Sequence, residues 1–252
     1  MKKALKGFYL LVSSLFITVL HLPFAFGKTS PAYKLAPGPV LSAKSSTTDS
    51  LHLITSIRSV YDSLHLDISG LSRQAFEYAQ KGWEKLIEQG KIINESVMAI
   101  VDFSQPSSHR RLYILDMKNY KVLFNTLVAH GKNSGKEWAS SFSNKPSSYK
   151  SSPGFYITGD TYMGSNGFSL RLNGIEKGIN DKAFDRAIVM HGADYVSDSY
   201  IEAQGYIGRS QGCPAVPAEE VYPIINTIKN GTCLFVYVPD KRYASRSPLL
   251  KG

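Results

Sequence analysis

Short apolar runs of β-strand length follow one another between residues 97 and 238, and they constrain the fold more than any other feature. Residues typical of turns, mainly Gly, Ser, Asn and Lys, separate them. The runs cover Val97–Phe103, Arg111–Asp116, Lys121–Val128, Gly154–Thr158, Phe168–Leu172, Ala187–His191 and Thr232–Val238. Because these predicted strands far outnumber the predicted helices, we expect a mainly β domain, a sandwich or barrel with peripheral helices.

Two connections between these runs add to the prediction. Met117–Tyr120 joins the second run to the third, and such a short connection predicts a β-hairpin. Residues 131–152 are rich in Gly, Ser, Asn and Lys and predict a long surface loop, which is more often functional than idle. One helix is expected late in the chain, where apolar residues recur at helical spacing at Val221, Ile224, Ile225 and Ile228.

Two further helices are expected before the β-rich part, as a short N-terminal helical segment. Ser50 can cap the first, which extends to Leu64. The second fits Ser72 to Gln89, and Gly90 stands where a left-handed residue commonly ends a helix. Their apolar stripes predict packing on the domain that follows; a pair of helices that binds a partner is the alternative.

The first 27 residues resemble a secretory signal peptide. A start with Lys2 and Lys3 precedes a largely apolar run from Phe8 to Leu22, and Ala25-Phe26-Gly27 supplies small residues at the first and third positions of a cleavage site. We expect cleavage after Gly27 and export to the periplasm or the extracellular cell-wall space. An uncleaved anchor is the alternative, but the run is shorter than the roughly 20 residues that a membrane span prefers.

The remaining chain divides by composition. No later stretch is long and apolar enough to cross a bilayer, so the mature chain is expected not to span a membrane. Proline, serine and threonine are frequent just after the signal, as in linkers. We therefore predict a signal peptide (1–27), a linker (28–49), the N-terminal helical segment (50–95), the β-rich domain (96–240) and a C-terminal tail (241–252).

The charge balance is moderately basic. The chain has 29 Lys and Arg against 20 Asp and Glu, a formal net charge of +9. Three lysines and no acidic residue lie in the signal, which leaves +6 after cleavage. This excess suits an anionic polymer, although a solvated basic surface is the simpler interpretation of most of these residues. The basic residues are scattered without a nucleic-acid-binding motif, so a nucleic-acid partner is not expected.

A cysteine and a histidine carry the chemistry that the sequence suggests. Cys213 follows Ser210, Gln211 and Gly212 in a turn, and His191 ends a buried strand. A thiol becomes a strong nucleophile as thiolate, and a nearby imidazole can take its proton and hold an ion pair. We therefore predict that Cys213 is a nucleophile, in its thiolate form, and that His191 is its base.

The residues around this pair have expected roles as well. Gly212 permits a tight turn, so that the backbone N–H groups of Cys213 and of Gly212 itself can bind an oxyanion. The Ser210 hydroxyl can donate or accept a hydrogen bond inside the turn. Arg209 can attract a substrate carboxylate, and Gly192 beside the histidine leaves room for substrate.

Three alternatives remain open from the residues alone. His191 could be a structural histidine. Cys213 could form a disulfide with Cys233, since an even pair of cysteines in an exported chain invites that interpretation, although Cys233 itself lies in a predicted buried strand. A zinc site could use His130, His191 and Cys213, but no HxH, HExxH or CxxC pattern supports it. No metal or other cofactor is predicted.

Several separated motifs resemble one family. His191-Gly192, a spacer and Ser210-Gln211-Gly212-Cys213 resemble the histidine and Ser/Thr-x-Gly-Cys motif of the L,D-transpeptidase catalytic domain (YkuD-like family). The likeness to its secreted branch extends over about residues 97–239 and includes Val101–Ser104, Arg111–Tyr113, Asn125–Gly131, Ser141–Asn144, Gly154–Tyr156, Ser169–Leu172 and Gly212–Pro217.

The resemblance implies an L,D-transpeptidase-type β-sandwich that acts on peptidoglycan stem peptides without a metal and is blocked by carbapenems. Cys213 would form an acyl-enzyme from a stem tetrapeptide and pass it to an amine, with His191 as base and then acid and a backbone carbonyl orienting the imidazole. Ser210 and Gly212 complete the expected catalytic group. The expected substrate contacts are Gly192, Arg209, Tyr162, Asn166 and Ser169.

The chain departs from better-known members of the family at two positions. Gln211 stands where they carry His or Arg, and Ala215 stands where they often carry Arg. These changes leave two alternatives to a transpeptidase. One is a hydrolase on the same scaffold, an L,D-carboxypeptidase or endopeptidase. The other is a cell-wall-binding protein that retains the fold without turnover.

Overall fold

The computed structural model describes residues 60–251. The predicted signal peptide and linker lie outside these residues. Of the first predicted helix only residues 60–64 are described, and residues 60–63 are helical. The strands are β1 (Val97–Asp102), β2 (Leu112–Asp116), β3 (Lys121–Thr126), β4 (Gly154–Gly164), β5 (Gly167–Gly174), β6 (Val189–Ala193), β7 (Ala215–Pro217) and β8 (Cys233–Tyr237). The helices are α3 (Arg73–Glu88), α4 (Asp198–Gln204), α5 (Val221–Ile228) and α6 (Lys241–Arg246).

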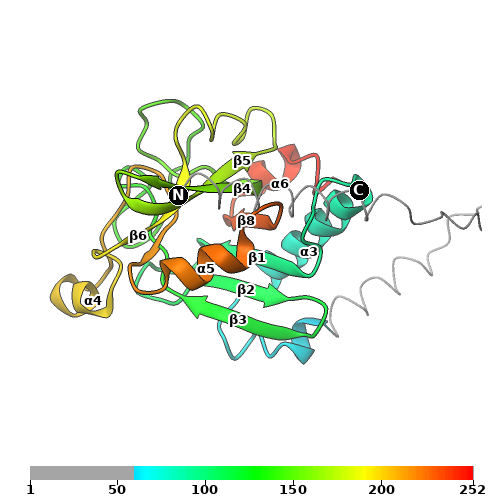
Figure 1. Cartoon of the computed structure of the whole chain (residues 1–252), viewed down its shortest axis with the longest axis horizontal. Coiled ribbons are helices and arrows are strands. Elements are labelled where there is room, and N and C mark those ends of the chain that lie inside the picture. The colour runs from blue at the N-terminus through cyan, green and yellow to red at the C-terminus, as the bar shows by residue number, and fades with distance from the viewer. Residues whose placement is uncertain (1–59, 252) are drawn as a thin grey trace, which may run out of the picture. The chain divides into compact units, whose positions relative to one another are not determined.

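All eight strands belong to one sheet, in the order β3-β2-β1-β8-β4-β5-β6-β7 (Figure 1). The β1–β8 and β6–β7 pairs are parallel, and the other neighbours are antiparallel, including the expected β2–β3 hairpin. The prediction of a mainly β domain with peripheral helices is confirmed. A sandwich was expected to have two layers of strands, and here the strands form one continuous sheet.

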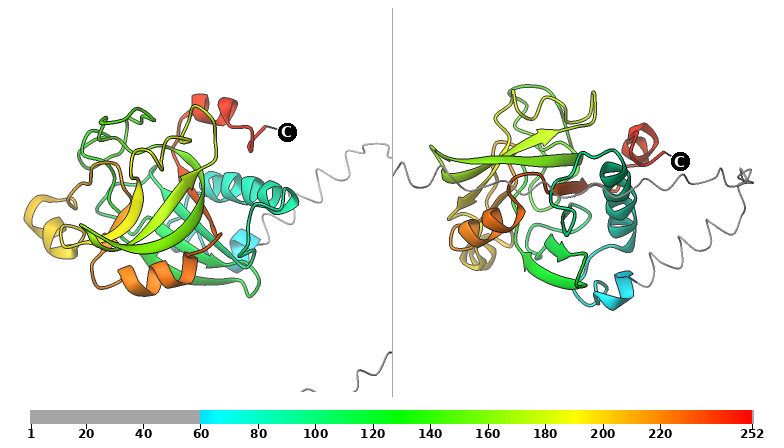
Figure 2. Two further views of the ribbon diagram at one scale, coloured as in Figure 1. Left: turned by 45° about the horizontal axis from the view of Figure 1, so that its top comes forward. Right: turned by 45° about the vertical axis from the view of Figure 1, so that its right-hand side comes forward.

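The two edges of this sheet meet at the start of β7. Just beyond β3, Ala129 donates its backbone N–H to the Ala215 carbonyl oxygen at 2.8 Å, in an antiparallel bridge. The sheet is therefore nearly closed, and Figure 2 shows its curvature through the long β4–β5 hairpin. This closure places the region after β3, the end of β6 and the start of β7 together.

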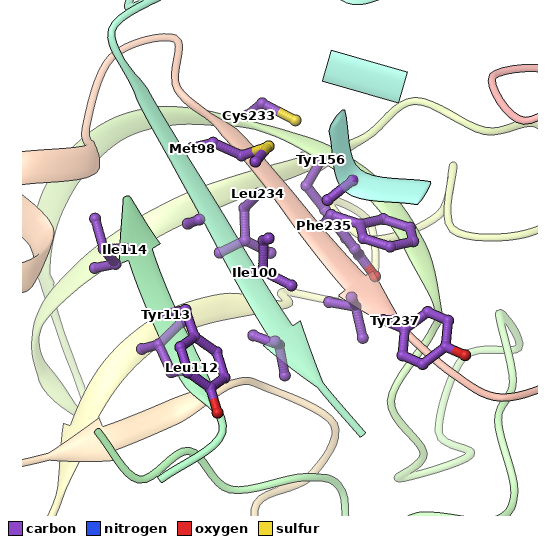
Figure 3. Packing of buried hydrophobic residues seen from close by; sticks show 14 of the residues in the cluster. Met98, Ile100, Leu112, Tyr113, Ile114, Tyr156, Cys233, Leu234, Phe235 and Tyr237 are labelled. Atoms are coloured by element: carbon purple, nitrogen blue, oxygen red, sulfur yellow. The ribbon is translucent and has the colours of Figure 1, made fainter. Parts of the chain in front are cut away.

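The core lies between the sheet and helices α3 and α5. Helix α3 agrees with the helix predicted from Ser72 to Gln89: Ser72 is its N-cap, whose hydroxyl accepts from the Ala75 N–H, and Gly90 after it has a φ of 63° as expected. Its buried face includes Phe76 and Leu86. In the sheet, β1 and β8 are buried along their whole length, and Figure 3 shows their side chains packed together.

Several local predictions differ from the structure. β4 continues beyond the predicted Thr158 through a β-bulge at Gly159-Asp160, and β6 extends to Ala193, so His191 lies within the strand and not at its end. β7 is too short to give a strand pattern. α4 was missed because none of its residues is buried, so it has no apolar stripe. The predicted C-terminal tail contains α6, whose Tyr243 is buried and donates its hydroxyl to Glu176 at 3.1 Å.

No helix within residues 60–251 combines the length and the apolar character that crossing a membrane requires.

Candidate active site

A pocket of about 810 Å³ opens where the edges of the sheet meet. It contains both residues of the predicted nucleophile–base pair, His191 and Cys213. The other lining residues come from the 131–152 loop, the β4–β5 turn, the segment before and after β6, α4 and the turn before Cys213. They are Ser147, Tyr149, Ser165, Asn166, Arg186, Ala187, Ile188, Gly192, Ala193, Asp194, Tyr195, Tyr200, Arg209, Ser210 and Gln211.

Strand pairing explains how residues so far apart in sequence meet. β6 and β7 are parallel, and their register places His191 opposite Ala215, so Cys213 lies two residues before the residue facing the histidine. On the other side, His191 pairs with Ser169 of β5. His191 is therefore held in the interior of the sheet, while Cys213 sits in the turn that leads into β7.

The His191 imidazole is fixed by a backbone carbonyl. Its Nδ1 lies 2.9 Å from the Gly192 carbonyl oxygen. Because a carbonyl only accepts, Nδ1 carries the proton and Nε2 keeps a free lone pair. Within residues 60–251, Nε2 has no hydrogen-bond partner. Burial lowers the pKa of His191, which the contact with Gly192 opposes, so the ring is neutral and able to accept a proton at neutral pH.

The Cys213 side chain is only 9% exposed, and its thiol points to the Ala187 carbonyl oxygen at an Sγ···O distance of 3.7 Å. Burial raises the pKa of Cys213, while the Val189 N–H and the charge of Arg186 act in the opposite direction. Burial therefore disfavours the charged form of both groups, while these contacts favour it on Cys213, and the resting thiolate stays a prediction.

The turn before Cys213 is organised by Ser210. As predicted, this hydroxyl bonds within the turn: it donates to the Cys213 carbonyl oxygen at 2.6 Å and accepts from the Gly212 N–H at 3.0 Å. Gly212 has a φ of +125°, and a Cβ there would lie 2.8 Å from the Lys150 carbonyl oxygen, so this position requires glycine.

These contacts correct one sequence-based expectation. The Gly212 N–H is not free to bind an oxyanion, because Ser210 uses it. The Cys213 N–H, by contrast, has no hydrogen-bond partner in the part of the chain that the structure describes.

The predicted substrate contacts divide into two groups. Gly192, Arg209 and Asn166 line the pocket, although a Cβ at Gly192 would meet Val221 at 3.1 Å, so close packing against α5 also requires glycine there. Tyr162 and Ser169 do not line it. Arg171 lies over the Tyr162 ring at 4.4 Å, and the Ser169 hydroxyl donates to the Gly167 carbonyl oxygen at 3.0 Å.

Several pocket residues were not predicted from the sequence. Tyr149 belongs to the 131–152 loop, whose length was the one signal for it. Tyr195 and Tyr200 lie in the polar and aromatic run between the two motifs. Arg186 carried no signal, since a lone arginine before an apolar run is common.

His130 and Cys233 lie outside this pocket and are both fully buried. Arg111 Nη2 is 2.8 Å from His130 Nδ1, and His130 Nε2 is 3.3 Å from the Gly135 carbonyl oxygen, so both ring nitrogens are engaged and His130 is not available as a zinc ligand. Within residues 60–251, no three His, Cys, Asp or Glu side chains are grouped closely enough to hold a metal ion. Both cysteines are free, so the disulfide alternative is wrong.

The sequence profile of the L,D-transpeptidase catalytic domain family matches residues 67–237. The chain belongs to this family. The match covers the α3 helix, all eight strands and the His191 and Cys213 motifs. No match was found among curated protein sequences.

Solved L,D-transpeptidase structures were also found among its structural neighbours. One is an L,D-transpeptidase from Mycobacterium smegmatis, at 12% identity and a TM-score of 0.35, covering 57% of this chain and 59% of that one. Another is L,D-transpeptidase 3 from Mycobacterium tuberculosis, at 13% identity and a TM-score of 0.36, with coverages of 57% and 61%. The helical cell shape determining protein Pgp2 from Campylobacter jejuni matches at 14% identity and a TM-score of 0.39, with coverages of 69% and 61%.

The chain thus spans about 60% of the length of these solved structures. Likenesses at such TM-scores assign no activity, and membership of the L,D-transpeptidase family rests on the sequence profile.

Proposed function

We propose that this protein is an exported, cysteine-dependent peptidoglycan L,D-transpeptidase. The observation that carries the proposal is the shared pocket of Cys213 and His191, in a chain of the L,D-transpeptidase family. The proposed substrate is a stem tetrapeptide, and the proposed place of action is the cell-wall space, to which the signal-like residues 1–27 would direct the chain.

In the first half of the reaction, the Cys213 sulfur attacks the carbonyl carbon of the third stem residue. His191 Nε2 takes the thiol proton as the C–S bond forms, because burial raises the pKa of the thiol and Nε2 has no hydrogen-bond partner among residues 60–251. The peptide bond to the terminal D-alanine breaks, and its amine leaves with the proton held by His191. The product is a thioester on Cys213.

In the second half, an amine of another stem attacks the thioester. A C–N bond forms and the C–S bond breaks, while His191 moves the proton from the incoming amine to the departing sulfur. The free thiol is restored, so protons and bonds balance over the cycle. Water in place of the amine would give hydrolysis.

The free N–H of Cys213 is the donor best placed to stabilise the tetrahedral oxyanion. It belongs to the nucleophile itself, and Ser210 holds the turn on both sides of it through the Gly212 N–H and the Cys213 carbonyl. Loss of a single such donor typically costs about 10²- to 10³-fold in kcat. Ser210 therefore acts by fixing the turn.

Arg209 is proposed to bind the substrate carboxylate. It lines the pocket, and no carboxylate among residues 60–251 lies within ion-pair distance of it. One guanidinium nitrogen donates to the Gly135 carbonyl oxygen at 3.2 Å, which directs the group toward the pocket rim and leaves the other donors for a ligand.

Product analysis with tetrapeptide muropeptides tests the function. The mature protein should give cross-linked dimers between third-position residues together with free D-alanine, and Cys213→Ala should give neither. Free tripeptide without dimers would identify the hydrolase instead. If neither product appears but the protein pellets with purified sacculi, the wall-binding alternative is the better account.

A further inference from the structure

Arg186 precedes β6 and lines the pocket. Among the described residues that line it, only Arg186 donates side-chain hydrogen bonds to both ends of the loop segment 143–152. Its Nη1 donates to the Ser143 carbonyl oxygen at 2.9 Å and to Ser152 Oγ at 2.6 Å. Its Nη2 donates to the Lys150 carbonyl oxygen at 2.6 Å and to Ser148 Oγ at 3.3 Å. One guanidinium thus joins the two ends of the segment 143–152.

This segment needs such support because its backbone is strained. Ser147 and Tyr149 have φ values of 54° and 52°, in the left-handed region that non-glycine residues rarely occupy. Both line the pocket. A conformation of this kind costs about 1–3 kcal/mol per residue and persists only where surrounding contacts impose it. The bonds from Arg186 to Ser148 and Lys150 fall on the residues next to the strained ones.

The same guanidinium lies beside the turn of the nucleophile. A Cβ at Gly212 would be 3.4 Å from Arg186 Nη2 and 2.8 Å from the Lys150 carbonyl oxygen that Arg186 holds. Ser151 Oγ also donates to the Gly212 carbonyl oxygen at 3.1 Å. The loop therefore packs against the Cys213 turn through Ser151 and the Lys150 carbonyl, and Arg186 holds that carbonyl.

The charge of Arg186 is not neutralised by an acid. No carboxylate lies within ion-pair distance of it among residues 60–251. Burial raises the pKa of Cys213 and lowers that of Arg186, and the charges of the two groups oppose these shifts. The titratable and charged groups that line the pocket with Cys213 are Tyr149, Arg186, His191, Asp194, Tyr195, Tyr200 and Arg209, and Tyr156 of β4 also acts on Arg186.

We propose that Arg186 is a positioning residue of the Cys213 site: it fixes the 143–152 segment against the Gly212 turn and supplies the positive charge that favours the Cys213 thiolate. The inference builds on the proposed role of Cys213 as nucleophile. The two tasks separate in variants, because lysine keeps the charge but cannot bridge both arms, whereas glutamine loses the charge.

The test measures the rate of Cys213 alkylation by iodoacetamide against pH, with the site identified by peptide mass spectrometry. Arg186→Gln should raise the midpoint of the profile by roughly one pH unit, as loss of a nearby opposite charge does. Arg186→Lys should keep the midpoint within a few tenths of a unit. Arg246→Gln removes an exposed arginine outside this pocket and serves as the matched control, with an unchanged midpoint.

Hydrogen exchange supplies the second measurement. Arg186→Lys should exchange the amides of residues 147–152 at least about tenfold faster than the wild type, because the strained segment opens more often. An unchanged midpoint in folded Arg186→Gln, or wild-type exchange in Arg186→Lys, overturns the proposal. If Arg186→Gln does not fold, the exchange result of Arg186→Lys decides alone.

The result is separable from the proposed function, because alkylation needs no peptidoglycan. A shifted midpoint in a protein without transpeptidase or hydrolase products supports the role of Arg186 and contradicts the enzymatic proposal. Cross-linked dimers together with an unshifted midpoint support the enzymatic proposal and contradict the role of Arg186.

Discussion

Residues 60–251 contain two buried histidines and two buried cysteines, one of each in the pocket and one of each outside it. His130 and His191 both have a lowered pKa through burial. His130 has protein partners at both ring nitrogens, whereas His191 has one at Nδ1 and leaves Nε2 without one among residues 60–251. Burial is therefore common to the two imidazoles, and the unfilled hydrogen-bonding position at Nε2 is what sets His191 apart.

The cysteines repeat this contrast. Cys233 is the first residue of β8, in register with Met98 of β1, and Figure 3 shows both side chains in the packed core. Burial raises the pKa of Cys233 far above the ordinary thiol range. Cys213 is buried almost as deeply but lines the pocket beside an arginine and a backbone N–H that favour its charged form. The two cysteines therefore differ in their surroundings, since Cys213 lines a pocket together with His191 and Cys233 packs in the core.

The largest expected effect comes from removing the Cys213 sulfur, and removing the Cys233 sulfur is the comparison. Cys213→Ala should lower transpeptidase turnover by about 10⁴-fold or more, since no covalent intermediate can form. Cys233→Ala should retain turnover within about twofold. The measurement is release of D-alanine from muropeptides, and equal losses in the two variants would break the distinction between the cysteines.

Replacing each histidine by glutamine sharpens the comparison of the imidazoles. His191→Gln should lower kcat by about 10²- to 10⁴-fold, the usual contribution of a general acid–base. At His130, a glutamine can still accept from Arg111 and donate to Gly135, so His130→Gln should stay within about threefold of the wild type.

The pH profile of the wild type adds a check on the base. Because burial lowers the pKa of His191, the acid limb of kcat/KM should fall below pH 6.5. A large loss of turnover in His130→Gln, or an acid limb above pH 7, would contradict the assignment of His191 as base.

Stability in acid should depend on His130. The pKa of His130 is lowered to about 3, from the 6.5 of an exposed histidine, and burial is the main cause. The unfolded chain therefore binds this proton first as the pH falls, so the stabilisation present above pH 6.5 is progressively lost toward pH 3. Between pH 6.5 and 4.5 the wild type should lose about 2–3 kcal/mol more unfolding free energy than His130→Gln, at about 1.4 kcal/mol per pH unit.

Urea titrations at matched ionic strength measure this difference. Parallel pH dependences for the two proteins would show that His130 is protonated in the folded state and that its contacts do not act as described.

The smallest expected effect is structural. Cys233→Ala leaves a small void in a fully buried strand position and should cost about 1 kcal/mol of unfolding free energy. Thermal unfolding checks this, with the activity assay as companion. Destabilisation by more than about 4 kcal/mol would mean that Cys233 has a role beyond packing.

Helices and strands could be predicted from the sequence where one local rule determined the outcome. Ser72 and Gly90 delimit α3 through cap chemistry, and the apolar runs located seven of the eight strands. The prediction failed where tertiary structure decided. The predicted strand stopped at Thr158, but β4 continues through a β-bulge at Gly159-Asp160, because pairing with β5 resumes after it.

The site shows the same division. His191, Cys213 and Ser210 were apparent as a spaced motif, and the structure places all three at one pocket. The protonation state of the pair could not be predicted, since it depends on burial that only the fold creates. Nor could Arg186, which reaches the site through contacts with residues more than thirty positions away.

Acylation by a carbapenem, followed by mass spectrometry of the intact protein, tests the central claim that Cys213 is the nucleophile. The account predicts a mass increase equal to one carbapenem on the wild type and on Cys233→Ala, and none on Cys213→Ala. No adduct on the wild type, or an adduct that persists in Cys213→Ala, would contradict it.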